Sequence, residues 1–475
     1  MLITLTAPAF AETWYIENGD ITVKASGTEG KNTVSQGNKK DVEDTNTIIT
    51  NQKTDTASSN TVTIEAGNDK VEVTLKDVNI DTSSRNNAAV SVTGSGNTTI
   101  KLDGDNALKS DTYRSGIAST GSLTISGGEN DSLTAQGGSG ANGISSSGSL
   151  TISGGTVTAT GGNSTGIVGY GGSGIYSSSG VAISGGAVTA NGGDSKDGYG
   201  GNGIYSSSVA ISGGTVKAAG GNGKDGYGGN GISSTSTTIS GGTVTANGGS
   251  GNSSGGNGIR SNGVTISGGA VNAAGGDGGN GKDGGYGIIS NDIDLSGSLE
   301  LTAKAGSPNG KALSQNDNEL DLDTIKEKLG PGAKVTATDA NGETKQVSIP
   351  RPVEPEKPVI PEESSSSSDG GSSAPSAPVS SIPGLTVTDK SGAVISYTST
   401  QSGNTLTVCV GRITASLHVS LAALRQLRAE GIETITFQTV LCSTTLSVDE
   451  LLAMGGEDAE AVLTHRSTDS SLTVG

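Results

Sequence analysis

One pattern of apolar and polar positions recurs along the chain between about residues 116 and 306. Each copy holds a G-I-x-S segment, a short Ser/Gly turn, a V-x-I-S segment, a Gly-Gly turn and an x-V-x-A segment. Apolar and small residues alternate within each segment, which is the period of a strand with one buried face. The Gly-Gly pair suits a tight turn with positive φ. The pattern therefore predicts three short strands per repeat.

The length of the repeat is nearly constant. The inner residue of the second segment recurs at intervals of 27, 31, 28, 28, 27 and 29 residues, at Ile125, Ile152, Ile183, Ile211, Ile239, Ile266 and Leu295. The first segment likewise has one apolar residue per repeat from Ile117 to Ile288, and the third segment has one from Leu133 to Val271. We therefore expect three inward apolar residues per coil. Upstream, Leu75, Ile100 and Ile125 lie 25 residues apart, which indicates a shorter coil.

These spacings predict an all-β fold, a right-handed parallel β-helix whose coils stack at about 4.8 Å. We place it at residues 12–345, with regular repeats at about 116–306. No proline occurs between Pro8 and Pro308, as continuous ladders require. The segment from Trp14 to Val23 should form the first rungs or cap the open end.

The last third of the chain differs in composition. Residues 346–383 are rich in Pro and Ser and predict an extended linker. Residues 384–475 predict a small α+β domain. In it, Ser420 caps one helix that ends at Gly431, and the S-x-x-E sequence from Ser447 opens a second helix that stops at Gly455.

Charge and composition narrow the function classes. The net charge of −18 and the absence of clustered Lys and Arg argue against nucleic-acid binding. Residues 1–11 read as the remnant of a signal peptide, so we expect a secreted or cell-surface bacterial protein. No run of about 18 apolar residues predicts a transmembrane segment. Export would permit a disulfide between Cys409 and Cys442, and we expect a monomer.

The long loop after the third strand is the first candidate site. It reads GGDSKDGYGGNG at residues 192–203, GGNGKDGYGGNG at 220–231 and GGNGKDGGYG at 278–287. The middle copy fits the calcium nonapeptide of RTX repeats, in which Gly permits the turn and oxygen atoms surround the cation. Asp197, Asp225 and Asp283 would be the carboxylate ligands. The alternative is a solvated, Gly-rich loop without metal.

Tyrosines gather in the same region. Tyr170, Tyr199 and Tyr227 each lie five residues before the first-strand isoleucine of their coil, so they should stack as a ladder along one edge. Tyr176 and Tyr205 directly follow that isoleucine and should point outward as a second pair. Such rings can hold the faces of pyranose sugars, but aromatic ladders also stabilise a β-helix without any ligand.

Little in the sequence predicts an enzyme. His418 is best explained as structural, and the repeat strands carry almost none of the paired carboxylates that a glycosidase needs. Rows of Thr and Ser, such as Thr156/Thr158 and Thr243/Thr245, suggest an ice-binding face, which Lys217 interrupts. A structural surface stalk also remains open.

With these residues, the chain resembles secreted bacterial β-helix proteins described as carbohydrate-binding domain-containing. The resemblance covers residues 12 to about 310. Its motifs are TWYI at 13–16, VTLKDVNI at 73–80, AVSV at 89–92, TIKLDGD at 99–105 and the I-S-G-G-x-V-x-A repeats. It implies a pectate-lyase-like fold and non-catalytic binding or adhesion to polysaccharide, an acidic plant glycan or a host glycan, with calcium as a cofactor. A polysaccharide lyase or hydrolase of this fold is the alternative.

Overall fold

The computed structural model describes two compact units, Met1–Glu356 and Lys357–Gly475. Described residues are 12–351 and 384–474, except 29, 165–168, 280, 390–391, 396, 403, 411, 413, 440–442, 455–458 and 466–469. The expected signal remnant, most of the expected linker, Cys442 and Gly455 therefore lie outside them. No helix within these described ranges is long and apolar enough to cross a membrane.

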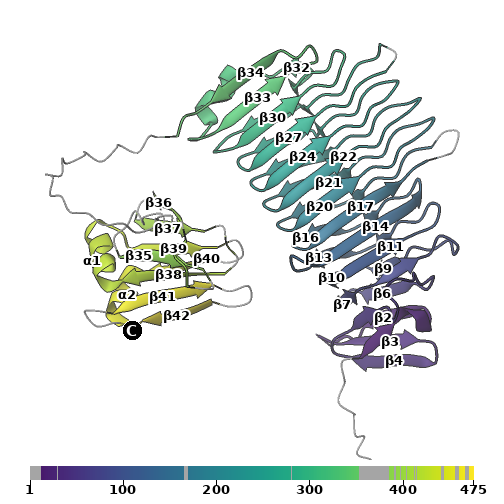
Figure 1. Ribbon diagram of the computed structural model, residues 1–475, viewed down its shortest axis with the longest axis horizontal. Coiled ribbons are helices and arrows are strands. Elements are labelled where there is room, and N and C mark those ends of the chain that lie inside the picture. The colour runs from purple at the N-terminus through teal and green to yellow at the C-terminus, as the bar shows by residue number, and fades with distance from the viewer. Residues whose placement is uncertain are drawn as a thin grey trace, which may run out of the picture. The chain divides into compact units, whose positions relative to one another are not determined.

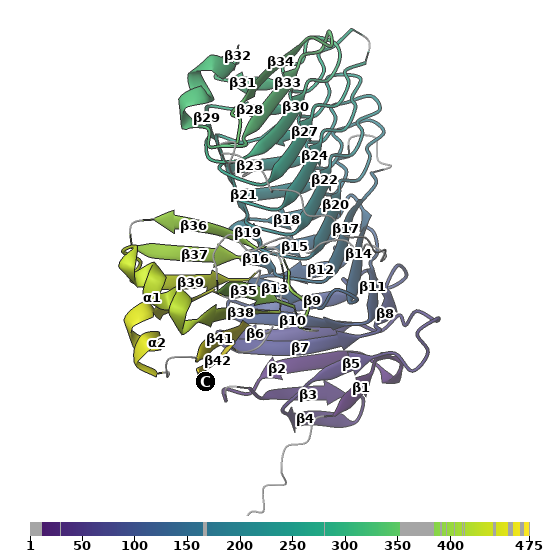
Figure 2. The same ribbon diagram turned by 60° about the vertical axis from the view of Figure 1, so that its left-hand side comes forward.

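The first unit is a parallel β-solenoid of about 12 turns, which confirms the predicted fold class (Figures 1 and 2). Three columns of strands run along it. The first-strand column is β2 (Ile21–Ala25), β6 (Val62–Gly67), β9 (Val90–Gly94), β12 (Ile117–Ser119), β15 (Ile144–Ser146), β18 (Ile175–Ser177), β25 (Ile259–Arg260), β28 (Ile288–Ser290) and β31 (Leu313–Gln315).

The second-strand column is β1 (Thr13–Tyr15), β5 (Ile48–Thr50), β7 (Lys70–Lys76), β10 (Asn97–Asp103), β13 (Ser122–Ser126), β16 (Ser149–Ile152), β19 (Gly180–Ile183), β26 (Gly263–Ile266) and β29 (Asp292–Leu295). Two long strands, β21 (Ile204–Ile211) and β23 (Ile232–Ile239), serve both columns, because each runs through the corner without a break.

The third-strand column is β8 (Asn79–Asp81), β11 (Asp105–Lys109), β14 (Ser132–Ser139), β17 (Thr156–Gly162), β20 (Ala187–Asn191), β22 (Thr215–Ala219), β24 (Thr243–Asn247), β27 (Ala270–Ala274), β30 (Glu300–Lys304) and β33 (Lys334–Thr338). Long loops leave this column and lie side by side along one edge of the solenoid (Figure 1).

The core holds more side chains per coil than the sequence predicted. In one coil Ile117, Leu123, Ile125, Leu133 and Ala135 are all at most 1% exposed, so the coil buries five apolar residues rather than three. The second and third strands each turn two alternate residues inward, and the second of these in the third strand is an alanine. Because alanine is small, the sequence pattern did not identify this position as part of the core.

The upstream register also differs from the prediction. Ile100 pairs with Val73 and with Ile125, whereas Leu75 pairs with Leu102. The 25-residue spacing of Leu75 and Ile100 is therefore not a stacking relation. The positive-φ turn was correctly predicted for the second glycine of five Gly-Gly pairs, as φ of +77° at Gly155 shows, but Gly128 in the first pair does not have a positive φ.

Both ends of the solenoid are closed by antiparallel pairing. At the N-terminal end β2 pairs with β3 (Asn32–Gln36), which continues to β4 (Lys39–Asp44), and the 3-10 helix η1 (Ile16–Asn18) joins β1 to β2. At the other end β32 (Asn318–Glu319) pairs with β31, β34 (Thr344–Ser348) pairs with β33, and a second 3-10 helix, η2 (Leu322–Lys328), lies between these pairs in sequence. These caps give the terminal strands a partner other than a second molecule.

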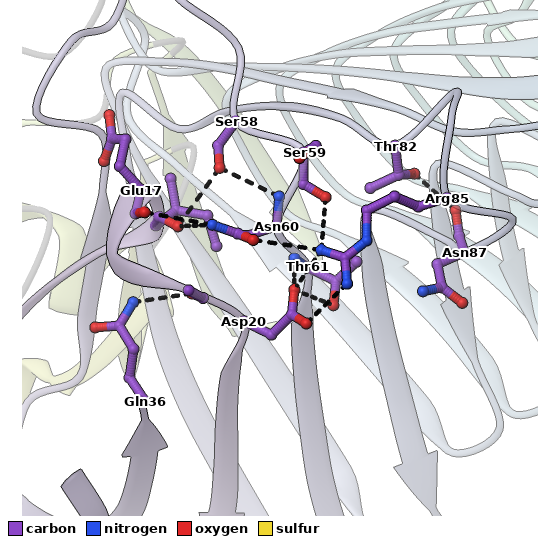
Figure 3. Close-up of polar contacts among 12 residues, drawn as sticks. Glu17, Asp20, Gln36, Ser58, Ser59, Asn60, Thr61, Thr82, Arg85 and Asn87 are labelled. Atoms are coloured by element: carbon purple, nitrogen blue, oxygen red, sulfur yellow. Dashed lines mark hydrogen bonds and ion pairs between the residues drawn. The ribbon is translucent and has the colours of Figure 1, made fainter. Parts of the chain in front are cut away.

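Polar contacts attach the N-terminal cap to the coils. The buried indole of Trp14 donates to the Asp44 carboxylate at 2.7 Å. Arg85 donates to both carboxylate oxygens of Asp20, at 2.8 and 2.9 Å, and to the carbonyl oxygen of Ser59 at 3.0 Å (Figure 3). We therefore assign Arg85 and Asp20 a structural role.

The second unit contains two four-stranded sheets and two helices. One sheet has the order β35 (Leu385–Thr388), β38 (Ala415–Ser420), β41 (Glu460–His465) and β42 (Ser470–Val474). The other has the order β36 (Thr398–Ser402), β37 (Thr405–Cys409), β39 (Thr434–Gln438) and β40 (Ser443–Ser447). Helix α1 (Leu421–Ala429) is capped by the hydroxyl of Ser420, and α2 (Val448–Met454) begins after Ser447, both as predicted.

Candidate glycan-binding face and the glycine edge

The long loops form an ordered, hydrogen-bonded layer, which we call the glycine edge (residues 192–203, 220–231, 248–258 and 275–287). Each loop has an outgoing limb and a return limb. In each coil, the N–H of a return-limb glycine donates to the carbonyl of an outgoing-limb glycine in the same coil. The carbonyl of that return-limb glycine accepts a hydrogen bond from the outgoing limb of the next coil. The bonds are 2.7 or 2.8 Å long and join Gly193, Gly201, Gly221, Gly229, Gly249, Gly256, Gly276 and Gly285 in sequence.

Glycine is required here because the limbs are too close for a side chain. A Cβ atom added at Gly192, Gly193, Gly200 or Gly201 would lie 1.9–2.2 Å from a backbone carbonyl oxygen. None of these four glycines has a positive φ. Close backbone packing is therefore sufficient to explain the glycines of the apparent calcium motif, and the loops are ordered by contacts between neighbouring coils.

A ladder of asparagines, which the sequence reading missed, supports the return limbs. Asn230 donates from its backbone and side-chain nitrogens to the side-chain oxygen of Asn202, at 2.9 and 3.0 Å. Asn257 does the same to Asn230, and the backbone N–H of Tyr286 then donates to Asn257 at 2.8 Å. The recurring G-G-N-G, with Asn two residues before each first-strand isoleucine, was the available signal.

The tyrosine ladder is present, but its geometry does not suit sugar stacking. The rings of Tyr170 and Tyr199 are 5.1 Å apart and 15° from parallel, and those of Tyr199 and Tyr227 are 4.7 Å apart and 8° from parallel. The facing sides of the three rings therefore cover one another, and both faces of the middle ring, Tyr199, are occupied. Sugar rings pack on free aromatic faces, so this ladder is best explained as stabilising the loops.

The three aspartates expected to bind calcium do not share one environment. Asp197 and Asp225 are aligned in neighbouring coils, because Ser195 and Gly223 pair in register. Asp283 instead lies one coil after Ser254 in the column of aligned positions that contains Tyr227. Its carboxylate accepts a hydrogen bond from Asn309 at 2.9 Å. The loop at 275–287 has two glycines between Asp and Tyr, which shifts its register.

The arrangement around these aspartates does not fit a calcium cage. Among the residues that the structure describes, no three His, Cys, Asp or Glu side chains gather where they could hold a metal ion. Backbone carbonyls nearby accept inter-coil hydrogen bonds: that of Ser195 from Lys224 and that of Lys196 from Asp225, both at 2.9 Å. Calcium prefers six to eight oxygen ligands, so these sites would need rearrangement to bind it.

The outward face of the first-strand column is a stronger candidate for binding. Tyr176, Tyr205, Ser233, Arg260 and Ile289 pair in register, one from each of five successive coils. The rings of Tyr176 and Tyr205 are 5.7 Å apart and tilted by 54°, so they do not cover each other as the ladder rings do. Tyr205 is 46% exposed. The small Ser233 separates this aromatic pair from Arg260.

A pocket of about 300 Å³ opens beside Ser233 and Arg260. Its lining also includes Ile289, Asn291, Asn316 and Asp317. Asn316 and Asp317 form the two-residue turn between β31 and β32, and both have positive φ, 49° and 62°. This turn, anchored by a 2.9 Å hydrogen bond from the Asn316 amide to the Asn291 carbonyl, supplies the pocket with groups from the last coil.

The pocket holds two opposite charges that do not pair. Among the described residues, the Arg260 guanidinium has no hydrogen bond or ion pair, and the same holds for the Asp317 carboxylate, although both line the pocket. Neither group is within ion-pair distance of the other, so each is available to a ligand in the pocket. Sequence reasoning missed both residues, because neither belongs to the repeated pattern.

His418 bonds Thr388 and Glu460, at 3.1 and 3.3 Å, which agrees with a structural role. On the third-strand face, Lys217 pairs in register between Thr189 and Thr245, so it interrupts the hydroxyl array as expected.

No protein-family model, no curated protein and no solved structure matches this chain. The function is therefore argued from the chemistry of the face itself.

Proposed function

We propose that the protein is an exported, non-catalytic carbohydrate-binding or adhesion protein, and that it presents the first-strand face of the solenoid to polysaccharide. The observation that carries this proposal is the row of the tilted Tyr176–Tyr205 pair, Ser233 and Arg260 beside a pocket. Aromatic surface next to a few unpaired polar groups is the usual composition of a sugar site. The coils stack at about 4.8 Å, so the row from Tyr205 to Arg260 spans roughly 10 Å, about the length of two sugar units.

A non-catalytic role is favoured because Asp317 is the one carboxylate among the residues lining this pocket. Glycoside hydrolysis ordinarily uses two carboxylates that face each other across the scissile bond. A lyase or hydrolase is the rival proposal, and release of reducing ends from any polysaccharide that the protein binds would favour it. A structural stalk is the second rival.

The proposal is tested by a glycan array of the full chain, run with and without calcium. We expect Tyr205→Ala and Arg260→Gln to weaken any binding at least about tenfold, the size of a lost stacking or charged hydrogen-bond contact. Tyr199→Ala is the matched control, because it removes an equally exposed ring from the ladder. Binding that depends on Tyr199 but not on Tyr205 or Arg260 would contradict the site, and absence of binding across the array would favour the stalk.

Calcium dependence is read from the same array. Because Asp197 and Asp225 are the two aligned carboxylates, Asp225→Asn is the variant that reports on them. If calcium raised binding in the native protein but not in Asp225→Asn, the calcium hypothesis would be supported. Equal binding with and without calcium would refute the calcium hypothesis.

A further inference from the structure

The unpaired charges in the pocket bear on which kind of sugar it accepts. The Arg260 guanidinium can only donate hydrogen bonds, and the ionised Asp317 carboxylate can only accept them. A ligand that satisfies both must accept from one side and donate to the other. A sugar hydroxyl does both, and two neighbouring hydroxyls can do so at once.

We infer that this pocket selects a neutral, polyhydroxylated sugar unit over a uronate; the inference rests on the proposed function. A uronate carboxylate would pair with Arg260, but it would bring a second negative charge next to Asp317 and could donate nothing to it. Like charges within one small site disfavour each other, and because Arg260 and Asp317 are exposed, water and salt limit the size of this repulsion. A neutral sugar satisfies Arg260 and Asp317 without this repulsion.

Other charges lie on the Asp317 side of the pocket, because the Lys311 ammonium donates to the backbone carbonyl of Asp317. The Asp317 carboxylate is felt by Tyr286, whose pKa is raised first by burial and then by Asp317 and Asp283. The net charge of −18 also opposes the approach of polyanions. The acidic-glycan partner expected from the resemblance is thus the less favoured class.

The test compares gluco-, galacto- and manno-oligosaccharides with the same oligosaccharides oxidised at C6 to uronates. We expect the native protein to prefer the neutral form. Asp317→Asn should reduce that preference roughly tenfold, because it removes the charge while keeping the shape. Asn also tolerates the positive φ of this turn position, so the hairpin should be retained.

Two controls separate charge in the pocket from charge elsewhere. Asp292→Asn removes a charge from β29, outside the pocket lining, and should leave the preference unchanged. Arg260→Gln should weaken both forms. A native preference for uronates, or an unchanged preference in Asp317→Asn, would overturn the inference while leaving glycan binding intact. Binding of neither form would refute the proposed function and the inference with it.

Discussion

The glycine edge makes a sharp prediction about Gly201. A Cβ atom at this position would lie 1.9 Å from the carbonyl oxygen of Gly172 and 2.6 Å from its carbon. Ordinary contact begins at 3.4 Å, so the two limbs would have to separate by about 1.5 Å. The Gly201 N–H bond to Gly193 and the Gly221 N–H bond to Gly201, each 2.8 Å long, cannot survive such a shift.

We therefore expect Gly201→Ala to destabilise the loop layer by about 2–6 kcal/mol. The estimate assumes that two buried backbone hydrogen bonds are lost, each with a cost of about 1–3 kcal/mol when the groups stay unpaired. Gly263→Ala is the matched control, because its added Cβ would meet nothing within 4 Å and its φ is not positive. It should be neutral or slightly stabilising, since alanine reduces the entropy of the unfolded chain.

Hydrogen exchange of peptides from residues 192–203 and 220–231 measures this effect where it occurs. A solenoid coil interacts mainly with its neighbours, so protection should fall in these loops and less in distant coils. Thermal unfolding of the whole chain is a weaker readout because it has two units. Equal protection in Gly201→Ala and Gly263→Ala would show that the limbs are not packed as described.

Three further predictions concern stability. Thr98→Val should stabilise the solenoid by about 1 kcal/mol, because the Thr98 hydroxyl is fully buried and has no partner among the described residues. Slower hydrogen exchange in β10 would support this prediction. Faster exchange would mean that the hydroxyl has a hydrogen-bond partner. Burial lowers the pKa of His465, so the free energy of unfolding of the second unit should decrease as pH falls below about 6.5, by at most about 1.4 kcal/mol per pH unit. Melting of the native protein and of His465→Gln as a function of pH tests this. Identical pH profiles would contradict it. Burial alone raises the pKa of Asp20, but hydrogen bonds from Arg85 and Thr61 lower it overall, so the cap should lose stability as pH falls below about 4. Arg85→Gln should lower the stability of the cap by less than about 1 kcal/mol, because the pair is partly exposed. Acid titration followed by Trp14 fluorescence measures both effects.

The repeat predicted the solenoid because stacking is a nearest-neighbour property. The recurrence of Ile125, Ile152 and Ile183 at the same place in each repeat is enough to put them in one column, and no long-range information is needed. The same reasoning placed Tyr170, Tyr199 and Tyr227 in a ladder. It failed for Leu75 because two alternating residues of one strand face inward, and spacing alone did not show which of them is the partner of Ile100.

The glycine edge could not be predicted in the same way. A glycine-rich loop read alone looks flexible, and its order arises only when copies pack against each other. The clash distances at Gly192, Gly193, Gly200 and Gly201 are properties of two limbs, not of one sequence.

The binding face depends on where the repeat is broken. A regular coil produces columns of identical side chains, such as the ladder of Tyr170, Tyr199 and Tyr227, whose rings stack face to face. In the first-strand column the sequence changes from Tyr205 to Ser233 to Arg260. This change leaves an exposed ring, a small residue and a cation that has no partner among the described residues. The end hairpin then adds Asp317. Selectivity in this fold therefore arises at irregular coils, and substitutions that restore the regular column, such as Ser233→Tyr, should abolish glycan binding while leaving the solenoid folded.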